Sequence, residues 1–176
     1  MSQWLDQLKI GEEISMRGPI GRLFYFGDGR FKLGTKEKPV VWREKTYKNV
    51  GMLCGGTGIT PLYQLLLSAS INSDPEVKYS MIFGNRTSSD ILLKEELDQL
   101  QSSPNLKFEL QYTIDKPEEN WTGLVGYITK ECIEKFIQPP REDTLILLCG
   151  RGAMCKKYLF PLLLEMGYKQ EDIFIF

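Results

Sequence analysis

The sequence predicts an α/β protein: a five-stranded parallel sheet with helices on both faces, preceded by a short antiparallel β segment. Three observations support this fold class. Short apolar segments alternate with helix-like segments from residue 47 onward. A glycine-rich turn joins the first apolar segment to a helix. The residues before that segment contain aromatic, strand-prone runs with no helix between them.

The first forty-odd residues favour short antiparallel strands. Residues 14–17 alternate in polarity, residues 23–26 are aromatic, and residues 30–33 follow a glycine-rich turn. Residues 36–45 are polar and charged, which indicates a connector or an edge segment. Two or three such strands form a poor core by themselves. We therefore expect residues 1–45 to be the end of a larger β-domain.

Strands and helices alternate through residues 46–176, which we expect to form one domain. Pro161 interrupts the last helix, so a kink or a late start is expected there, and Gly167 closes it. Ser88 or Ser89 is a candidate cap for the second helix. Such alternation is typical of a parallel sheet covered on both faces. The expected strands are 47–54, 78–84, 107–113, 144–149 and 172–176, and the expected helices are 61–70, 89–101, 129–137 and 153–166.

The glycine-rich turn, residues 55–61, is the first candidate binding element. Its spacing Gly56-x-Gly58-x-x-Pro61 is close to the dinucleotide fingerprint, with proline in place of the third small residue. Pro61 suits the first helical position, and the helix N-terminus favours an electron-rich ligand. The absence of Gly-Lys-Ser/Thr argues against a nucleoside triphosphate loop. A strand-to-helix turn that binds nothing is the alternative.

Polar residues and glycines gather at the expected carboxyl ends of the strands, where ligands of parallel sheets bind. Asp115 is suited to a ribose diol and would repel a 2′-phosphate, or it caps a turn before Pro117. Arg86 is either a ligand for adenine or pyrophosphate or, by preference, a solvated loop cation. Cys149 lies against a nicotinamide ring or is a small buried residue.

Composition narrows the chemistry. The chain is 42% hydrophobic and 26% charged with a net charge of −1, which gives no electrostatic reason to expect nucleic acid as a partner. There is no histidine, which excludes Ser-His-Asp and Cys-His catalysis and favours chemistry carried by a cofactor. The four cysteines form no Cys-x-x-Cys pair. We expect reduced thiols, no metal site, no secretory signal and no membrane-spanning segment.

Several motifs together resemble the flavin-dependent NADH–cytochrome b5 reductases and the related nitrate reductase flavoprotein domains. The resemblance covers the whole chain and depends on the order and spacing of its pieces. These are Met1-Ser2-x-x-Leu5, Arg17-Gly18-Pro19-x-Gly21, the turn from Gly55 to Pro61, Asp90-Ile91-Leu92-Leu93, Tyr112-Thr113-Ile114-Asp115, Cys149-Gly150 with Met154, and Phe176.

The resemblance implies a ferredoxin-reductase-like NAD-binding domain and a role for each matched residue. Met1 and Ser2 resemble the end of a motif that holds the FAD pyrophosphate, and Thr60 matches a threonine near the flavin. Asp115 matches the residue that selects NADH over NADPH, and Cys149 matches the cysteine beside the nicotinamide carbon that gives up hydride. Five more residues and the terminal aromatic complete the implied cofactor site: Gly55, Gly56, Thr57, Gly150, Met154 and Phe176.

The resemblance also implies a function. NADH gives hydride to FAD, and electrons then pass to a haem protein such as cytochrome b5. Residues 1–45 are then the end of an FAD-binding β-barrel whose remainder lies in cis outside this chain, which makes the chain alone inactive. We expect a position on the cytoplasmic side, with membrane anchoring through a segment before Met1.

Departures from the family pattern keep alternatives open. Arg151-Gly152-Ala153 stands where the family has a proline-rich loop, so nicotinamide placement there differs, or Arg151 engages a phosphate. The alternatives are a flavoprotein module of nitrate reductase, an oxygenase reductase component, and a nucleotide-binding domain without catalysis.

Overall fold

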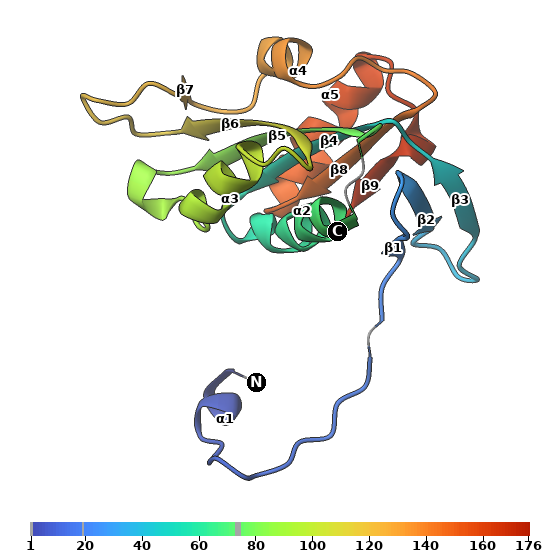
Figure 1. Cartoon of the computed structure of the whole chain (residues 1–176), viewed down its shortest axis with the longest axis vertical. Helices are drawn as coiled ribbons and strands as arrows, with labels where there is room; N and C mark the ends of the chain where they lie inside the picture. The colour runs from blue at the N-terminus through green and yellow to red at the C-terminus, as the bar shows by residue number, and fades with distance from the viewer. Residues whose placement is uncertain (1, 19, 73–74) are drawn as a thin grey trace.

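The computed structural model describes residues 2–18, 20–72 and 75–176. A six-stranded parallel sheet with strand order β7-β6-β5-β4-β8-β9 forms the body, and an antiparallel sheet β1-β2-β3 lies beside it (Figure 1). The strands of the parallel sheet are β4 (Asn49–Gly55), β5 (Lys78–Asn85), β6 (Lys107–Ile114), β7 (Leu124–Val125), β8 (Thr144–Cys149) and β9 (Ile173–Ile175). Those of the smaller sheet are β1 (Leu23–Tyr25), β2 (Arg30–Gly34) and β3 (Trp42–Thr46).

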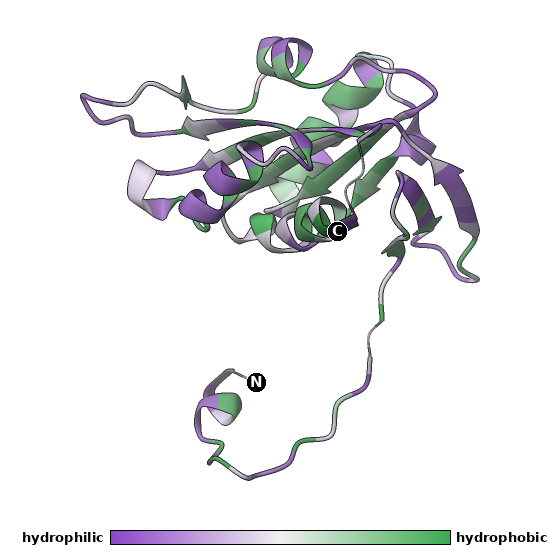
Figure 2. Ribbon diagram, viewed as in Figure 1, coloured by the Kyte–Doolittle hydropathy of each residue, from purple (hydrophilic) through white to green (hydrophobic). Residues whose placement is uncertain are grey.

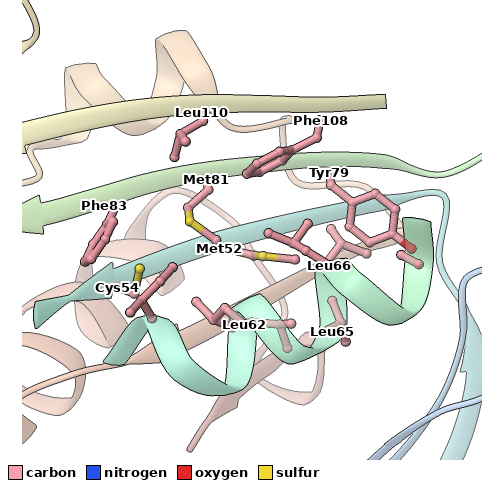
Figure 3. Packing of buried hydrophobic residues seen from close by; sticks show 14 of the residues in the cluster. Met52, Cys54, Leu62, Leu65, Leu66, Tyr79, Met81, Phe83, Phe108 and Leu110 are labelled. Atoms are coloured by element: carbon pink, nitrogen blue, oxygen red, sulfur yellow. The ribbon is translucent and has the colours of Figure 1, made fainter. Parts of the chain in front are cut away.

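Helices cover both faces of the parallel sheet, as expected for a sheet whose central strands are apolar throughout. One buried cluster joins the sheet to α2 (Ile59–Asn72) and α3 (Lys94–Gln101). The opposite cluster joins it to α4 (Lys130–Phe136), the helical turn η3 (Ala153–Leu159) and α5 (Phe160–Glu165). Figure 3 shows the first cluster, in which side chains from β4, β5 and β6 meet those of α2. The predicted fold class is confirmed.

The parallel sheet has one strand more than the sequence predicts. β7 contains only two residues, and it pairs with the end of β6 through Leu124 opposite Thr113 and Val125 opposite Ile114. A two-residue strand has no periodicity to detect, which is why the sequence does not reveal it. It extends the sheet only at its carboxyl end.

The N-terminal region also differs from the prediction. Residues 14–17 belong to an extended segment and not to a strand, because alternation without a partner strand forms no ladder in the part of the chain that the structure describes. This segment leads back to α1 (Ser2–Asp6), which lies apart from both sheets (Figure 1). Within residues 36–45, both alternatives apply: residues 36–41 connect β2 to β3, and residues 42–45 belong to the edge strand β3.

Two helix starts follow local chemistry that the sequence only partly indicates. The expected helix 89–101 begins at Lys94, because Ser88–Asp90 forms a separate 3-10 turn. Thr87, not Ser88 or Ser89, caps that turn: the Thr87 amide and hydroxyl donate to the Asp90 carboxylate at 3.1 and 2.7 Å. Helix α2 begins at Ile59, so Pro61 is its third residue and not its first.

Pro161 explains an irregular last helix. The turn η3 is a π-helix that runs directly into α5, where Pro161 stands near the start. In a continuous α-helix the proline ring would clash with the carbonyl of Lys157, four residues earlier. The wider π turn removes that clash. A disturbance was predicted at Pro161, and a π turn is the form it takes.

A buried carboxylate ties the two sheets together at the amino edge of the parallel sheet. Asp172, just before β9, accepts hydrogen bonds from Tyr47 and Arg43 at 2.7 Å and from Lys45 at 3.1 Å. Its side chain is only 4% exposed. Burial alone would raise the Asp172 pKa, but the bonds from Tyr47, Arg43 and Lys45 outweigh it and hold the pKa below its usual value. No helix among the described residues is long and apolar enough to cross a membrane.

Candidate functional site

The strand order reverses between β4 and β8. The chain leaves β4 and moves outward through β5, β6 and β7, and it then returns to the other side of β4 for β8 and β9. In such sheets the carboxyl ends of the strands on either side of the reversal form the ligand-binding crevice. Cys54 at the end of β4 pairs with Cys149 at the end of β8. The two segments singled out by the sequence are therefore neighbours in the structure.

The glycine turn after β4 packs against the backbone at the end of β8. Gly56 has a φ of +54°, a left-handed conformation that glycine adopts without strain. A Cβ atom on Gly58 would lie 2.2 Å from the carbonyl oxygen of Cys149, so no side chain fits at that position. Thr57 and Thr60 are exposed beyond the turn, and the Thr60 hydroxyl donates to the Thr57 carbonyl at 3.1 Å.

Met154 completes a tight group with two glycines. A Cβ atom on Gly55 would lie 3.2 Å from the Met154 sulfur, and one on Gly150 would lie 2.8 Å from its methyl carbon. These three residues come from the end of β4, the end of β8 and the start of η3. The structure thus brings Gly55, Gly150 and Met154 together beside Cys149, as the sequence predicts.

Cys149 is half-buried, and burial raises the pKa of its thiol. The neutral thiol is therefore favoured near neutral pH, and a thiol without charge is a poor nucleophile. All four cysteines are free. In this environment Cys149 is suited to packing against a ligand and not to forming a covalent bond with one.

Asp115 lies at the other end of the same edge. It follows β6 and is exposed, and its backbone N–H donates to the carbonyl of Asn85 at 3.1 Å. Three inter-strand spacings separate β6 from β8, which is a distance of about 14 Å. Asp115 and Cys149 are thus far enough apart to contact opposite ends of one extended ligand, with the glycine turn between them.

The remaining predicted residues fall in different places. Phe176 follows β9 and is half-exposed, and its N–H donates to the carbonyl of Leu148, which places it beside the end of β8. Met1 lies outside the described residues. Ser2 belongs to α1, which lies away from the carboxyl edge (Figure 1). The structure therefore places Ser2, the described one of the two residues expected to hold FAD pyrophosphate, away from this site.

One residue of the edge escaped the sequence analysis. Asn85 ends β5, is 9% exposed, and has no hydrogen-bond partner among the described residues for either atom of its side-chain amide. An unpartnered buried polar group costs about 1–3 kcal/mol. An asparagine at the end of an apolar strand beside a glycine turn was the available signal, but its burial depends on tertiary packing.

The family comparison agrees with this geometry. Residues 52–159 match the family model described as the oxidoreductase NAD-binding domain, and this range contains β4, the glycine turn, Asp115 and Cys149. The chain belongs to the oxidoreductase NAD-binding domain family. The family assignment agrees with the dinucleotide-binding interpretation of the glycine turn, whose own role stays a prediction.

Individual relatives point in the same direction. The chain is 42% identical over its whole length to NADH-cytochrome b5 reductase 2 of Danio rerio and covers 57% of that protein. It is 38% identical to NADH-cytochrome b5 reductase 2 of Homo sapiens and covers 63% of it. A solved structure, the cytochrome b5 reductase domain of Ulva prolifera nitrate reductase, matches 99% of the chain with a TM-score of 0.86 and 31% identity, and the chain covers 64% of it. The predicted resemblance is confirmed.

The residues at the edge fit a nicotinamide dinucleotide. Gly56 adds no side chain at the turn, where a Cβ would meet nothing within 4 Å. Asn85 offers a donor and an acceptor without partners among the described residues, and Asp115 offers an exposed carboxylate. The carboxyl edge thus supplies polar groups at β5 and β6 and bare backbone at the glycine turn.

Proposed function

We propose that this chain is the NADH-binding part of an FAD-dependent reductase of the cytochrome b5 reductase type. The single observation that carries the proposal is the packing at the strand-order reversal, where the glycine turn lies against the end of β8 beside Cys149. The chain spans 57% to 63% of the length of the curated relatives named above. In the proposal, residues 1–45 belong to an FAD-binding domain in cis and residues 46–176 bind NADH.

The residues of this chain perform positioning in the proposed reaction. In the proposed reaction, bound NADH would supply a hydride to FAD. The electrons would then pass one at a time to a haem protein such as cytochrome b5. Cys149, Gly150 and Met154 orient the nicotinamide, and Asp115 accepts hydrogen bonds from the adenine ribose. Thr57 and Thr60 are exposed beside the turn, where a flavin would approach. None of these roles needs a general base, which agrees with a chain without histidine.

Two elements of the proposal concern the whole protein. Attachment to the cytoplasmic side of a membrane through a segment before Met1 is proposed from the resemblance alone. Arg151, exposed in the loop before η3, is proposed as a ligand for a phosphate of the dinucleotide.

Titration calorimetry of the chain with NADH and, separately, with NADPH tests the binding function. We expect NADH to bind and NADPH to bind at least about tenfold more weakly, because the Asp115 carboxylate repels a 2′-phosphate. Absence of NADH binding would contradict the proposal. Equal affinity for the two nucleotides would contradict the role of Asp115 alone.

A nitrate reductase module is the second candidate, favoured by the match to the Ulva prolifera domain. The two functions differ in the electron acceptor. The full-length protein, supplied with NADH, should reduce cytochrome b5 in a stopped-flow assay under the first proposal. Reduction of ferricyanide without reduction of cytochrome b5 would favour the second, and reduction of neither with FAD bound would indicate a binding domain without catalysis.

A further inference from the structure

Asn85 stands apart from the other buried polar residues of the parallel sheet. Four of these use their side chains in hydrogen bonds: Ser80 with Gln138, Thr113 with the Gly126 carbonyl, Thr144 with the Pro139 carbonyl, and Asp172 with the network at the amino edge. Asn85 is 9% exposed, yet its amide nitrogen and its amide oxygen are both buried and both lack partners among the described residues. Native proteins rarely leave such a group unpaired without a functional reason.

The strand register places Asn85 inside the nucleotide crevice. Gly84 pairs with Gly55 and Asn85 pairs with Ile114, so Asn85 lies level with Gly56, the first residue of the glycine turn. Side chains alternate between the two faces of a strand. Asn85 therefore shares its face with Phe83, which packs in the cluster that includes α2. Asn85 thus lies on the face of the sheet that α2 covers, and the glycine turn leads directly into this helix.

Asn85 also lies between the two ends of the crevice. One strand separates it from Cys149 at the end of β8, and its own backbone carbonyl accepts from the N–H of Asp115. A dinucleotide that extends from Asp115 to Cys149 passes over this position. No strand lies between β5 and β6, so the parts of the ligand nearest to Asn85 are its centre and the ribose on the Asp115 side.

The chemistry of the carboxamide selects among these groups. A pyrophosphate only accepts hydrogen bonds, so it would satisfy the Asn85 nitrogen and leave the oxygen unpaired. A ribose hydroxyl both donates and accepts, and a diol satisfies both amide atoms. Building on the proposed function, we propose that Asn85 binds the ribose diol of NADH on the Asp115 side of the pyrophosphate and thereby holds this half of the nucleotide over β5.

The test compares two variants in the same strand of this 176-residue chain. Asn85→Leu removes the amide and keeps the number and branching of the side-chain heavy atoms, and Ser80→Ala removes a hydroxyl that is already paired with Gln138. We expect Asn85→Leu to raise the NADH dissociation constant about tenfold while its melting temperature stays equal or rises, because the free chain loses only an unpaired group. Ser80→Ala should lower the melting temperature and leave the NADH affinity unchanged.

Asn85→Asp distinguishes the ribose from the pyrophosphate. A carboxylate still accepts from a hydroxyl but repels a phosphate, so the proposal expects Asn85→Asp to bind NADH more tightly than Asn85→Leu. Weaker binding than that of Asn85→Leu would assign the contact to the pyrophosphate and overturn the ribose assignment. Unchanged NADH affinity in Asn85→Leu, or a melting temperature lowered as in Ser80→Ala, would overturn the inference alone. A wild-type chain that binds no NADH would overturn the proposed function and this inference together.

Discussion

The two edges of the parallel sheet treat buried polar groups in opposite ways. At the amino edge, Asp172 is surrounded by donors from Tyr47, Arg43 and Lys45, and every bond serves the fold. At the carboxyl edge, Asn85 is buried without a partner, and the glycine turn leaves backbone exposed to a ligand. Both edges belong to the same sheet, but their polar groups have different roles. Those at the amino edge stabilise the fold, and those at the carboxyl edge stay available for binding.

The surface around the sheet shows the same division. Figure 2 shows hydrophobic central strands and a hydrophilic β3, the strand that supplies Arg43 and Lys45 to the amino edge. The Arg43 and Lys45 side chains thus face Asp172, where they compensate a buried charge. Variants at the two edges should therefore separate effects on stability from effects on binding.

Gly58→Ala should have the largest effect, and it should affect both properties. The new Cβ would meet the Cys149 carbonyl at 2.2 Å, so either the turn or the end of β8 must move. We expect a loss of about 3 kcal/mol in the free energy of unfolding and at least a tenfold loss of NADH affinity. Urea denaturation and calorimetry measure the two quantities.

Gly152→Ala is the matched control, because a Cβ there meets nothing within 4 Å and its φ is −56°. It should leave stability within about 0.5 kcal/mol of wild type. A Gly58→Ala variant as stable as Gly152→Ala would show that the close packing of the turn on β8 is not required.

Asp172→Ala should reduce stability without reducing binding. The substitution leaves the buried Tyr47 hydroxyl without its acceptor and the cations of β3 without their counter-ion, and we expect a loss of about 2–3 kcal/mol. Urea denaturation provides the measurement. Glu142→Gln, which breaks an exposed ion pair with Lys169, should change stability by less than about 0.5 kcal/mol. A tenfold loss of NADH affinity in Asp172→Ala would contradict the separation of the two edges.

Asp115→Asn should change selectivity with little effect on stability, because Asp115 is exposed. Removing the negative charge should raise NADPH affinity about tenfold and lower NADH affinity by a smaller factor, since one acceptor oxygen remains. Competition binding with the two nucleotides measures the ratio. A ratio equal to that of wild type would remove Asp115 from the site.

The pH dependence of stability should show the smallest effect, and it should come from the amino edge. The Asp172 pKa is lower in the folded chain than in the unfolded chain, so its stabilisation is present above the unfolded value and is lost as pH falls through the folded value. The wild-type chain should therefore lose more stability than Asp172→Asn as acid is added below about pH 4. Parallel acid profiles of the two proteins would contradict this origin.

The sequence predicts helices and strands whose residues follow a repeating pattern, and it misses contacts that follow no such pattern. Strand 144–149 is predicted with its correct bounds because it is a continuous apolar run between polar residues. The glycine turn is also found, because its φ and close-packing requirements leave a composition signal. Strand β7 depends on its pairing with β6, and the π turn before Pro161 depends on crowding by the proline ring. Patterns of alternating residues encode neither.

The site divides in the same way. Cys149, Asp115 and the glycines follow strand ends, so the alternation of elements places them at one edge. The burial of Asn85 and the partners of Asp172 depend on residues far apart in the chain: Tyr47 and Asp172 are separated by 125 positions. No local pattern connects such residues. The boundary between residues 45 and 46 and the role of Thr60 stay predictions.

The position of Trp121 gives the crevice an optical reporter. Its indole N–H donates to the carbonyl of Leu124, which pairs with Thr113 two residues before Asp115. The other two tryptophans, Trp4 and Trp42, are half-exposed in α1 and β3. Reduced nicotinamide absorbs light where indole emits, so energy transfer from Trp121 would report occupancy of the crevice. With Trp4 and Trp42 replaced by phenylalanine, the intrinsic fluorescence of a single side chain would follow the nucleotide as it arrives and leaves.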